Sequence, residues 1–176
     1  MAASQKGDTI AFNRLVLKWE RTVFNAAFRL LQDREEAAEA AQETFLLAFK
    51  NIRHFRRDSK FSTWLYRIAL NHCITRLQQR PTGTHVSIDD PAASALPDRL
   101  RVSETPAGEL MRSEQKRRVL AAITHLSPEQ RAVVELKFFQ ELTFEEISEV
   151  LGTPLSTIKS RLYTALEALK VRLGSG

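Results

Sequence analysis

The strongest constraint on the fold of this chain is a set of helix start and stop signals near its C-terminal end. Residues 127–130 (SPEQ) and 143–146 (TFEE) both have the form of a capping box. Gly152 then ends the second of these helices, and Pro154 follows at the first turn of the next. The signals predict a short helix, a tight turn and a longer helix, which is the layout of a helix-turn-helix.

Apolar residues recur at helical spacing through most of the chain, and no segment alternates as an exposed strand would. The predicted fold class is therefore all-α. Phe45, Leu46 and Phe49 are expected to face inward from the second helix, and Ser59 or Ser62 to cap the third. The predicted helices cover residues 8–31, 35–51, 61–79, 112–124, 128–138, 143–151 and 154–172.

Residues 81–110 interrupt this pattern with four prolines and two glycines. Pro and Gly at that density break helices, so we expect a flexible acidic linker over residues 81–111. The chain then divides into two small helical domains, residues 1–80 and residues 112–176, of which the second is the helix-turn-helix.

The chain of 176 residues has a net charge of +5, and residues 51–80 concentrate the positive charge. Seven Lys and Arg residues lie in that stretch with a single acid, Asp58. Such a concentration attracts an anionic partner, for which nucleic acid is the first candidate and a membrane surface the second. No apolar run approaches the ~20 residues of a membrane span, and the N-terminus lacks the apolar core of a signal peptide. We expect a cytoplasmic protein without membrane insertion.

Catalytic and metal sites find little support in the sequence. The four histidines have no metal-ligand spacing, and a single cysteine, Cys73, excludes an intramolecular disulfide. Cys73 falls on an apolar helix face, which favours simple burial over a redox role. The sequence contains no phosphate-binding glycine loop and no nucleophile elbow. We expect no enzymatic activity, no metal and no cofactor.

The predicted last helix, residues 154–172, has an apolar face that should pack on the preceding helix. The opposite face carries small donors, a cation and an aromatic hydroxyl, which suit a helix in the DNA major groove. An ordinary solvated face is the alternative. The residues expected to contact DNA are Ser156, Lys159, Ser160, Tyr163 and Thr164, with Arg161 at the flank.

Two further patterns suggest binding surfaces in the first domain. Glu35, Glu39 and Glu43 recur every four residues, and like charges at this spacing weaken a helix unless a basic partner meets them. A solvated face is again the alternative. Residues 55–72 combine aromatics, small polar residues and cations, which suit either a pocket for unstacked bases or a non-specific phosphate patch. Trp64 and Leu65 also fit a helix core.

Three segments of the sequence, in this order, resemble an extracytoplasmic function (ECF) sigma factor of bacteria. They are DREEAAEAAQETFLLAFKNI, FRRDSKFSTWLYRIALNHCITRL and LSPEQRAVVELKFFQELTFEEISEVLGTPLSTIKSRLYTALEALK. The resemblance implies a transcription factor that binds RNA polymerase core, recognises −35 and −10 promoter elements and starts promoter melting. The resemblance also implies a role in stress response.

The resemblance implies a role for each segment. The region-2-like domain docks on polymerase through Glu39, Gln42 and Glu43, with Asp33 and Glu36 as further candidates. The loop and helix that follow recognise the −10 element and capture a flipped base. The residues expected there are Arg56, Arg57, Ser59, Lys60, Phe61, Trp64, Arg67 and Asn71. Phe61 fits either the wall of the base pocket or the first residue of the core.

The region-4-like domain would read the −35 element, where Lys137 joins the DNA-facing residues of the last helix. Thr164 stands where some members place an arginine, so the resemblance does not predict which −35 bases this chain reads. The implied partners are the clamp helices and flap of core polymerase, promoter DNA (duplex at −35, single-stranded at −10) and an anti-sigma factor. The free chain is expected to be a monomer.

Two other classes of function compete with this interpretation. One is a stand-alone helix-turn-helix transcription regulator whose N-terminal domain senses an effector or dimerises. The other is a purely structural interaction protein. A strongly basic stretch such as residues 51–80 is unusual for a sensor domain, which argues against the regulator.

Overall fold

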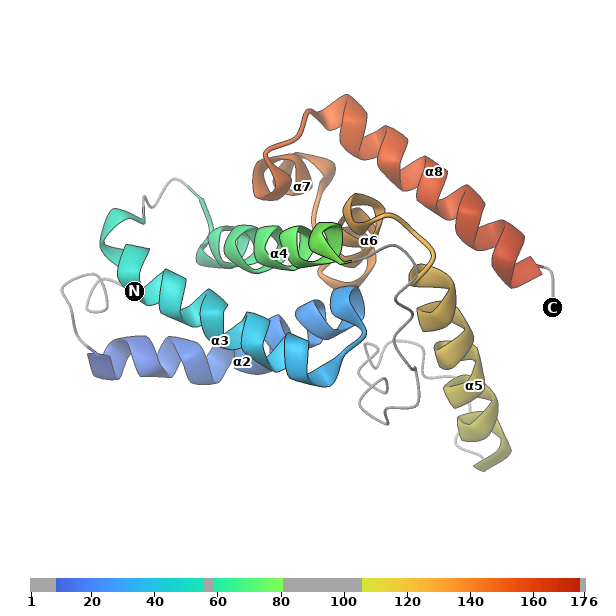
Figure 1. The fold of residues 1–176 in the computed structure, drawn as a ribbon, viewed down its shortest axis with the longest axis horizontal. Coiled ribbons are helices and arrows are strands. Elements are labelled where there is room, and N and C mark those ends of the chain that lie inside the picture. Colours follow the sequence, from blue (N-terminus) through green and yellow to red (C-terminus); the bar gives the residue numbers. More distant parts are fainter. Residues whose placement is uncertain (1–8, 56–58, 81–105, 175–176) are drawn as a thin grey trace.

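The computed structural model describes residues 9–55, 59–80 and 106–174, and the side chains of all of these except residues 106–113. The described residues contain helices and no strands, so the all-α prediction is confirmed (Figure 1). The elements are α2 (Thr9–Leu31), α3 (Arg34–Asn51), the 3-10 helix η1 (Ile52–His54), α4 (Phe61–Gln79), α5 (Pro106–Ile123), α6 (Pro128–Val134), the π-helix η4 (Glu135–Phe139), α7 (Phe144–Leu151) and α8 (Leu155–Gly174).

Local capping fixes most of the helix ends. Both predicted capping boxes form: Ser127 Oγ accepts from the Gln130 N–H at 3.2 Å, and Thr143 Oγ1 from the Glu146 N–H at 3.1 Å. Gly152 ends α7 with a φ of 59°, a left-handed conformation that glycine adopts without strain. The tight turn between α7 and α8 is therefore the one that the sequence predicts.

The start of one helix and the cap of another differ from the sequence prediction. Helix α5 begins at Pro106 rather than at residue 112, because proline is well suited to a first helical position. The remainder of the predicted linker lies outside the described residues. The N-cap of α4 is Lys60, which makes no side-chain capping bond, so neither Ser59 nor Ser62 caps this helix.

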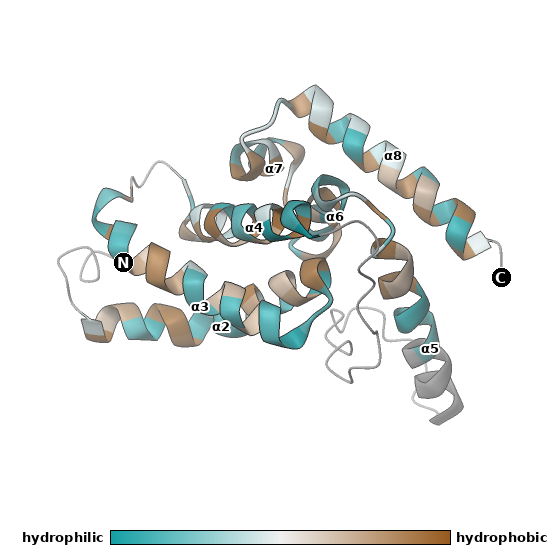
Figure 2. Ribbon diagram, in the orientation of Figure 1, coloured by the Kyte–Doolittle hydropathy of each residue, from teal (hydrophilic) through white to brown (hydrophobic). Residues whose placement is uncertain are grey.

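Helices α2 and α3 form a hairpin, and α4 packs against both of them; we call this the N-terminal lobe (Figure 1). Its own core includes Phe12, Val23, Ile52 and Leu65. Helices α5 to α8 form the C-terminal lobe, in which the buried face of α8 packs beside α7. Figure 2 colours the ribbon by hydropathy, and in both lobes apolar residues recur along the helices among hydrophilic ones.

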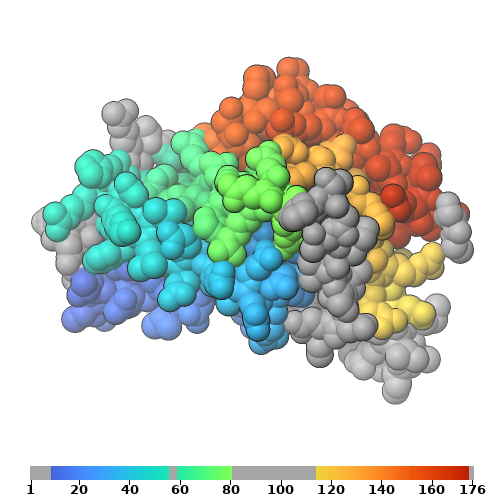
Figure 3. Space-filling view, in the orientation of Figure 1, coloured from blue at the N-terminus to red at the C-terminus, as the bar shows by residue number. Residues whose placement is uncertain are grey.

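The two lobes pack directly against each other. A single cluster of buried residues joins Leu31, Tyr66 and Leu70 of the N-terminal lobe to Leu136 and Ile147 of the C-terminal lobe. Helix α4 contacts both α6 and α7, and the space-filling view shows the two lobes in contact (Figures 1 and 3). The sequence predicted two domains but gave no sign that they share buried surface.

Helix α3 buries its small residues rather than its large ones. Ala37, Ala40 and Ala48 are fully buried, whereas Leu46 and Phe49 are 48% and 44% exposed. The prediction that Leu46 and Phe49 face inward is therefore wrong. Alanine faces let α3 approach its neighbours closely, and this leaves no room for the larger side chains on the same side.

None of the helices in the described part of the chain combines the length and the apolar composition that a bilayer crossing requires.

Candidate nucleic-acid interface

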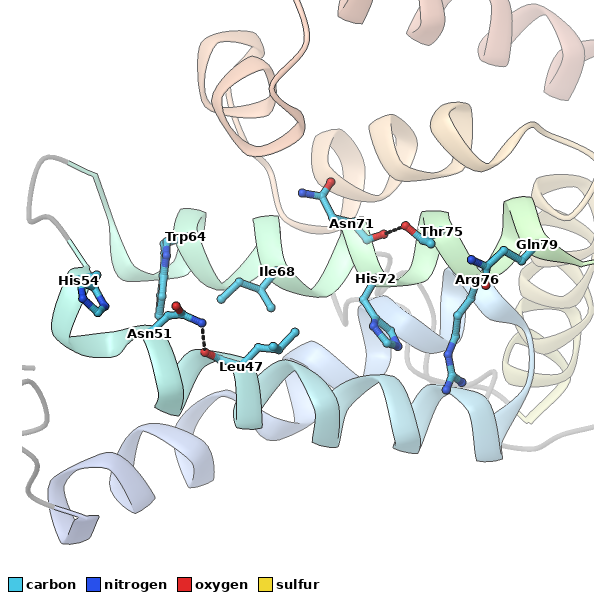
Figure 4. Close-up of a pocket in the computed structure, with 10 residues that line it drawn as sticks. All are labelled: Leu47, Asn51, His54, Trp64, Ile68, Asn71, His72, Thr75, Arg76 and Gln79. Atoms are coloured by element: carbon cyan, nitrogen blue, oxygen red, sulfur yellow. Dashed lines mark hydrogen bonds between the residues drawn. The ribbon is translucent and has the colours of Figure 1, made fainter.

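A groove of about 670 Å³ runs between α3 and α4 (Figure 4). Of the residues predicted for −10 recognition, Trp64 and Asn71 line it. The α3 side and η1 contribute Asn51 and His54, and their side chains face α4 across the groove. The remaining lining residues are Leu47, Ile68, His72, Thr75, Arg76 and Gln79.

Sequence reasoning missed most of the polar lining of this groove. Asn71, Thr75 and Gln79 recur every four residues and so lie along one face of α4. That spacing is visible in the sequence, but of the three residues only Asn71 is among those predicted for −10 recognition. Asn51 and His54 come from another segment, and only the fold brings them to this face.

Phe61 belongs to an aromatic cluster at the end of the groove. Its ring centroid lies 6.0 Å from that of Phe55, 5.7 Å from that of Trp64 and 6.3 Å from that of Trp19. The side chain is half-buried and packs on the core of the N-terminal lobe. Phe61 thus supports Trp64, whose indole lines the groove.

Lys60 and Arg67, two of the predicted DNA-contacting cations, are exposed but engaged by α7. Lys60 Nζ lies 2.7 Å from Glu146 Oε1, and the Arg67 guanidinium donates to the backbone carbonyl of Glu149. The hydrogen bond with Glu146 raises the pKa of Lys60, and the same bond lowers the pKa of Glu146. Arg56 and Arg57 lie outside the described residues, and Ser59 is half-buried just before α4.

His72 and Cys73 lie in the middle of α4. The Nε2 atom of His72 is buried and has no hydrogen-bond partner among the described residues. Burial lowers the pKa of the imidazole, and the charge on Arg76 lowers it further. Cys73 is fully buried, and burial raises the pKa of its thiol to about 12, so the predicted burial is confirmed.

The acidic residues predicted to bind polymerase lie on α3. Glu39 is exposed and forms an ion pair with Arg76 of α4 at 2.9 Å, while Gln42 is exposed and Glu43 is half-buried. Asp33 and Glu36 have structural contacts. The Asp33 carboxylate accepts from the Glu36 N–H at 2.9 Å and caps α3, and the Glu36 carboxylate pairs with Arg80 at the end of α4.

A second, more apolar groove of about 940 Å³ separates α3 from α2 and adjoins Gln42. The exposed side chains of Leu46 and Phe49 line it together with Phe45. Sequence reasoning missed this surface because it placed Leu46 and Phe49 in the core.

The polar face of α8 lies open to solvent. Ser156, Lys159, Ser160, Tyr163 and Thr164 are all exposed, and Tyr163 is 63% exposed. Arg161 and Lys137 are half-buried. Lys137 Nζ donates to the Leu142 carbonyl at 3.1 Å and lies 4.8 Å from the ring centroid of Phe144. Lys159 lies 5.6 Å from the same centroid.

The groove between α3 and α4 and the open face of α8 carry polar side chains that suit contacts with nucleic acid. Within the residues that the structure describes, no three His, Cys, Asp or Glu side chains lie close enough together to hold a metal ion. The groove between α3 and α4 offers an indole, amides and hydroxyls, which can stack on and hydrogen-bond to bases.

Comparison with known proteins agrees with this description. The Sigma-70 region 2 family matches residues 15–81, and the Sigma-70, region 4 family matches residues 116–169. The RNA polymerase sigma-H factor of Pseudomonas aeruginosa is 35% identical over 169 residues, which cover 94% of this chain and 87% of the relative. The ECF RNA polymerase sigma-E factor of Haemophilus influenzae is 31% identical over 172 residues, which cover 96% and 90%.

Two solved structures share the fold. One is CnrH in complex with the cytosolic domain of CnrY, with a TM-score of 0.70, 23% identity and coverage of 99% of this chain and 94% of that one. The other is the sigma factor RpoE from Bartonella quintana in complex with the anti-sigma factor NepR, with a TM-score of 0.69, 19% identity and coverage of 93% and 97%. The two matched regions and the full-length relatives lead to one conclusion: the chain belongs to the ECF family of RNA polymerase sigma factors.

Proposed function

We propose that this chain binds RNA polymerase core, directs it to promoters with −35 and −10 elements, and starts promoter melting. The observation that carries the proposal is the presence of two distinct polar surfaces on one chain. The groove between α3 and α4 suits unstacked bases, and the open face of α8 suits duplex DNA.

The groove between α3 and α4 is the proposed −10 site. Unstacking a base costs a few kcal/mol, so a site that melts DNA needs prepared contacts for the bases it extrudes. The Trp64 indole offers a stacking face, and Asn71 and Gln79 offer donors and acceptors for base edges. Arg76 lies in the same groove and can approach a phosphate.

Helix α8 is the proposed −35 reader. Its exposed Lys159 and Tyr163 lie outside the face that buries Ile158 and Leu162, so a duplex can approach without disturbing the core. Donors on such a face read base edges in the major groove, while cations fix the helix on phosphates.

Core polymerase is the proposed partner of α3, through Glu39, Gln42 and Glu43. Two modest DNA sites held together by polymerase gain affinity through effective concentration, so neither lobe needs to bind tightly alone. We therefore place the chain with polymerase in the cytoplasm. An anti-sigma factor is a further proposed partner, since the RpoE structure of Bartonella quintana contains one.

The test compares the DNA binding of the free chain with that of the chain bound to core polymerase. A promoter fragment selected from a genomic library by the reconstituted complex serves as the duplex probe in fluorescence anisotropy. We expect weak binding by the free chain and tight, salt-sensitive binding by the complex. A stand-alone helix-turn-helix regulator would instead bind its duplex tightly without polymerase, and that result would reject the proposal.

A further inference from the structure

Glu39 of α3, a residue proposed to dock on polymerase, forms an ion pair with a residue of the proposed −10 groove. Arg76 extends from α4 toward α3, and its Nη2 atom lies 2.9 Å from Glu39 Oε2 (Figure 4). The Glu39 side chain is 64% exposed and that of Arg76 is 31% exposed. The pair therefore lies near the surface, where other charged groups can compete for either partner.

Two hollows of the N-terminal lobe meet at Arg76. One is the groove between α3 and α4, and the other is a smaller hollow of about 380 Å³ lined by Glu36, Glu39, Arg76, Gln79 and Arg80. Arg76 and Gln79 line both of them. The proposed docking carboxylate and the proposed DNA groove are thus neighbours that share one guanidinium group.

The next ion pair along α4 is anchored more firmly. Arg80 pairs with Glu36 and also donates to the Leu31 carbonyl at 3.1 Å, and its side chain is 18% exposed. These contacts tie the end of α4 to the segment that joins α2 to α3. Arg80 is therefore a structural residue, whereas the more exposed Arg76 can exchange Glu39 for another anion at a small cost in stability.

A second residue proposed for docking acts on the same part of α4. His72 lies one turn before Arg76 and lines the groove. Burial lowers the pKa of His72, the charge on Arg76 lowers it further, and the charge on Glu43 opposes the shift. The charges of Glu43 and Arg76 therefore act on the same side chain, so a change in the charge carried by α3 alters the electrostatic potential in the groove.

The Glu39–Arg76 pair opposes both of the proposed uses of its members. While Arg76 is bound to Glu39, the carboxylate offsets the charge of the guanidinium and repels a DNA phosphate. Arg76 in turn repels a cation of polymerase that approaches Glu39. A cation bound to Glu39 weakens the pair and leaves Arg76 for a phosphate, and a phosphate bound to Arg76 leaves Glu39 for the cation.

We propose that the Glu39–Arg76 pair couples polymerase docking to capture of the single-stranded −10 backbone. In the free chain Glu39 holds Arg76, and when a basic surface of polymerase engages Glu39, Arg76 turns to a DNA phosphate in the groove. DNA in the groove strengthens docking by the same factor, because coupling between two sites is reciprocal. The coupling rests on the proposed function, which assigns Glu39 to polymerase and the groove to DNA.

The DNA half of the coupling is tested with the free chain and a fluorescein-labelled single-stranded oligonucleotide that carries the −10 sequence of the selected promoter. Glu39→Gln removes the charge that holds Arg76. An exposed ion pair limits the gain in affinity to about two- to fivefold, measured by fluorescence anisotropy. The salt dependence of log affinity should steepen by about 0.7, the value for one added phosphate contact on a single strand. Glu20→Gln removes an exposed carboxylate from α2 and should bind like the parent.

A double-mutant cycle assigns the gain to Arg76. In an Arg76→Gln background, Glu39→Gln should no longer raise the affinity for the oligonucleotide. In an Arg76→Lys background, which keeps a cation at this position, part of the gain should return. An equal gain with and without the cation at this position would mean that Glu39 acts by general repulsion of DNA, and that result would overturn the proposal.

The −10 assignment is tested separately with Asn71→Ala, which removes an exposed amide from the groove. We expect weaker binding of the oligonucleotide in this variant. An unchanged affinity would count against the −10 assignment, whatever the double-mutant cycle shows about Glu39 and Arg76.

The polymerase half of the coupling is measured without DNA, by competition with the labelled parent chain for core polymerase. Arg76→Gln releases Glu39, so this variant should bind core about two- to fivefold more tightly than the parent. Arg14→Gln, which removes an exposed cation from α2, is the control and should bind like the parent. Glu39→Gln should bind core more weakly, and unchanged binding in this variant would refute the docking assignment. Weaker binding in Glu39→Gln with no gain in Arg76→Gln would overturn the coupling and leave the docking assignment intact.

Discussion

Lys60, at the start of the proposed −10 helix, and Glu146, in the first turn of α7, form an ion pair with an N–O distance of 2.7 Å. The pair links the two lobes, which the proposed function assigns to different promoter elements. Because Lys60 is exposed, the pair contributes little to stability. Its expected effect is on DNA binding, since the Glu146 carboxylate competes with a DNA phosphate for Lys60.

The Glu146→Gln variant should free Lys60 with little effect on folding. Glutamine at this position can still complete the capping box with Thr143, so α7 keeps its N-terminus. We expect a nearly unchanged Tm and tighter binding of the free chain to single-stranded DNA, measured by fluorescence anisotropy. Glu145→Gln, an exposed neighbour in the same turn, is the control and should bind like the parent. Unchanged affinity in Glu146→Gln would show that the pair does not mask Lys60.

Charge reversal at Glu39 and Glu43, both to Lys, should abolish binding to core polymerase. In the Glu39–Arg76 pair the Glu39 side chain is 64% exposed and Arg76 is half-buried, so its loss should cost about 1 kcal/mol, and the Tm should fall only slightly. Co-elution of the variant with core polymerase on gel filtration measures binding. Reversal of Glu114 and Glu167, two exposed residues of the C-terminal lobe, makes the same change in net charge and should leave core binding intact. Retained binding in the first variant would refute the docking assignment.

Replacing Lys159 and Tyr163 with alanine should weaken the response to the −35 element. A good base contact contributes about 1–3 kcal/mol, so we expect at least a tenfold loss of discrimination between intact and scrambled −35 sequences. Abortive initiation assays measure this discrimination, and core binding should stay at the parental level. Lys170→Ala, on a more distal exposed turn of α8, is the control. An unchanged −35 response would mean that another surface reads the duplex.

The half-buried His72, whose Nε2 atom is fully buried, should make the chain less stable in mild acid. Burial lowers the pKa of its imidazole from the ordinary 6.5, so the unfolded chain takes up a proton that the folded chain resists. The free energy of unfolding should therefore fall as the pH drops below 6.5. Urea unfolding midpoints across this range measure the effect.

The His72→Gln variant should lose part of this pH dependence, whereas His54→Gln, at an exposed position, should keep it. If the two variants behave alike, the imidazole of His72 does not resist protonation in the folded chain.

The helices were predictable because their signals are local. Backbone groups at these helix ends are satisfied within a few residues, by the capping boxes at Ser127 and Thr143 and by Gly152. The helix ends can therefore be predicted directly from the sequence. Periodicity failed on α3, where Leu46 and Phe49 looked like core residues while the neighbouring alanines formed the true packing face. A pattern of apolar residues does not say which of two apolar faces is buried.

The lobe contact was not predictable from any local pattern. Arg29 and Glu135 lie 106 residues apart, and nothing beside either residue marks it as half of a buried pair. The π-helical turn that begins at Glu135 likewise depends on tertiary packing. The polar row of Asn71, Thr75 and Gln79 was visible in the sequence, but its meaning depends on α3 lying alongside.

Run-off transcription with purified core polymerase on a genomic fragment library tests the central claim most directly. The account predicts transcripts that appear only when this protein is added and that start downstream of shared −35 and −10 sequences. A library that yields no protein-dependent transcript, while the same core is active with another sigma factor, would contradict the account.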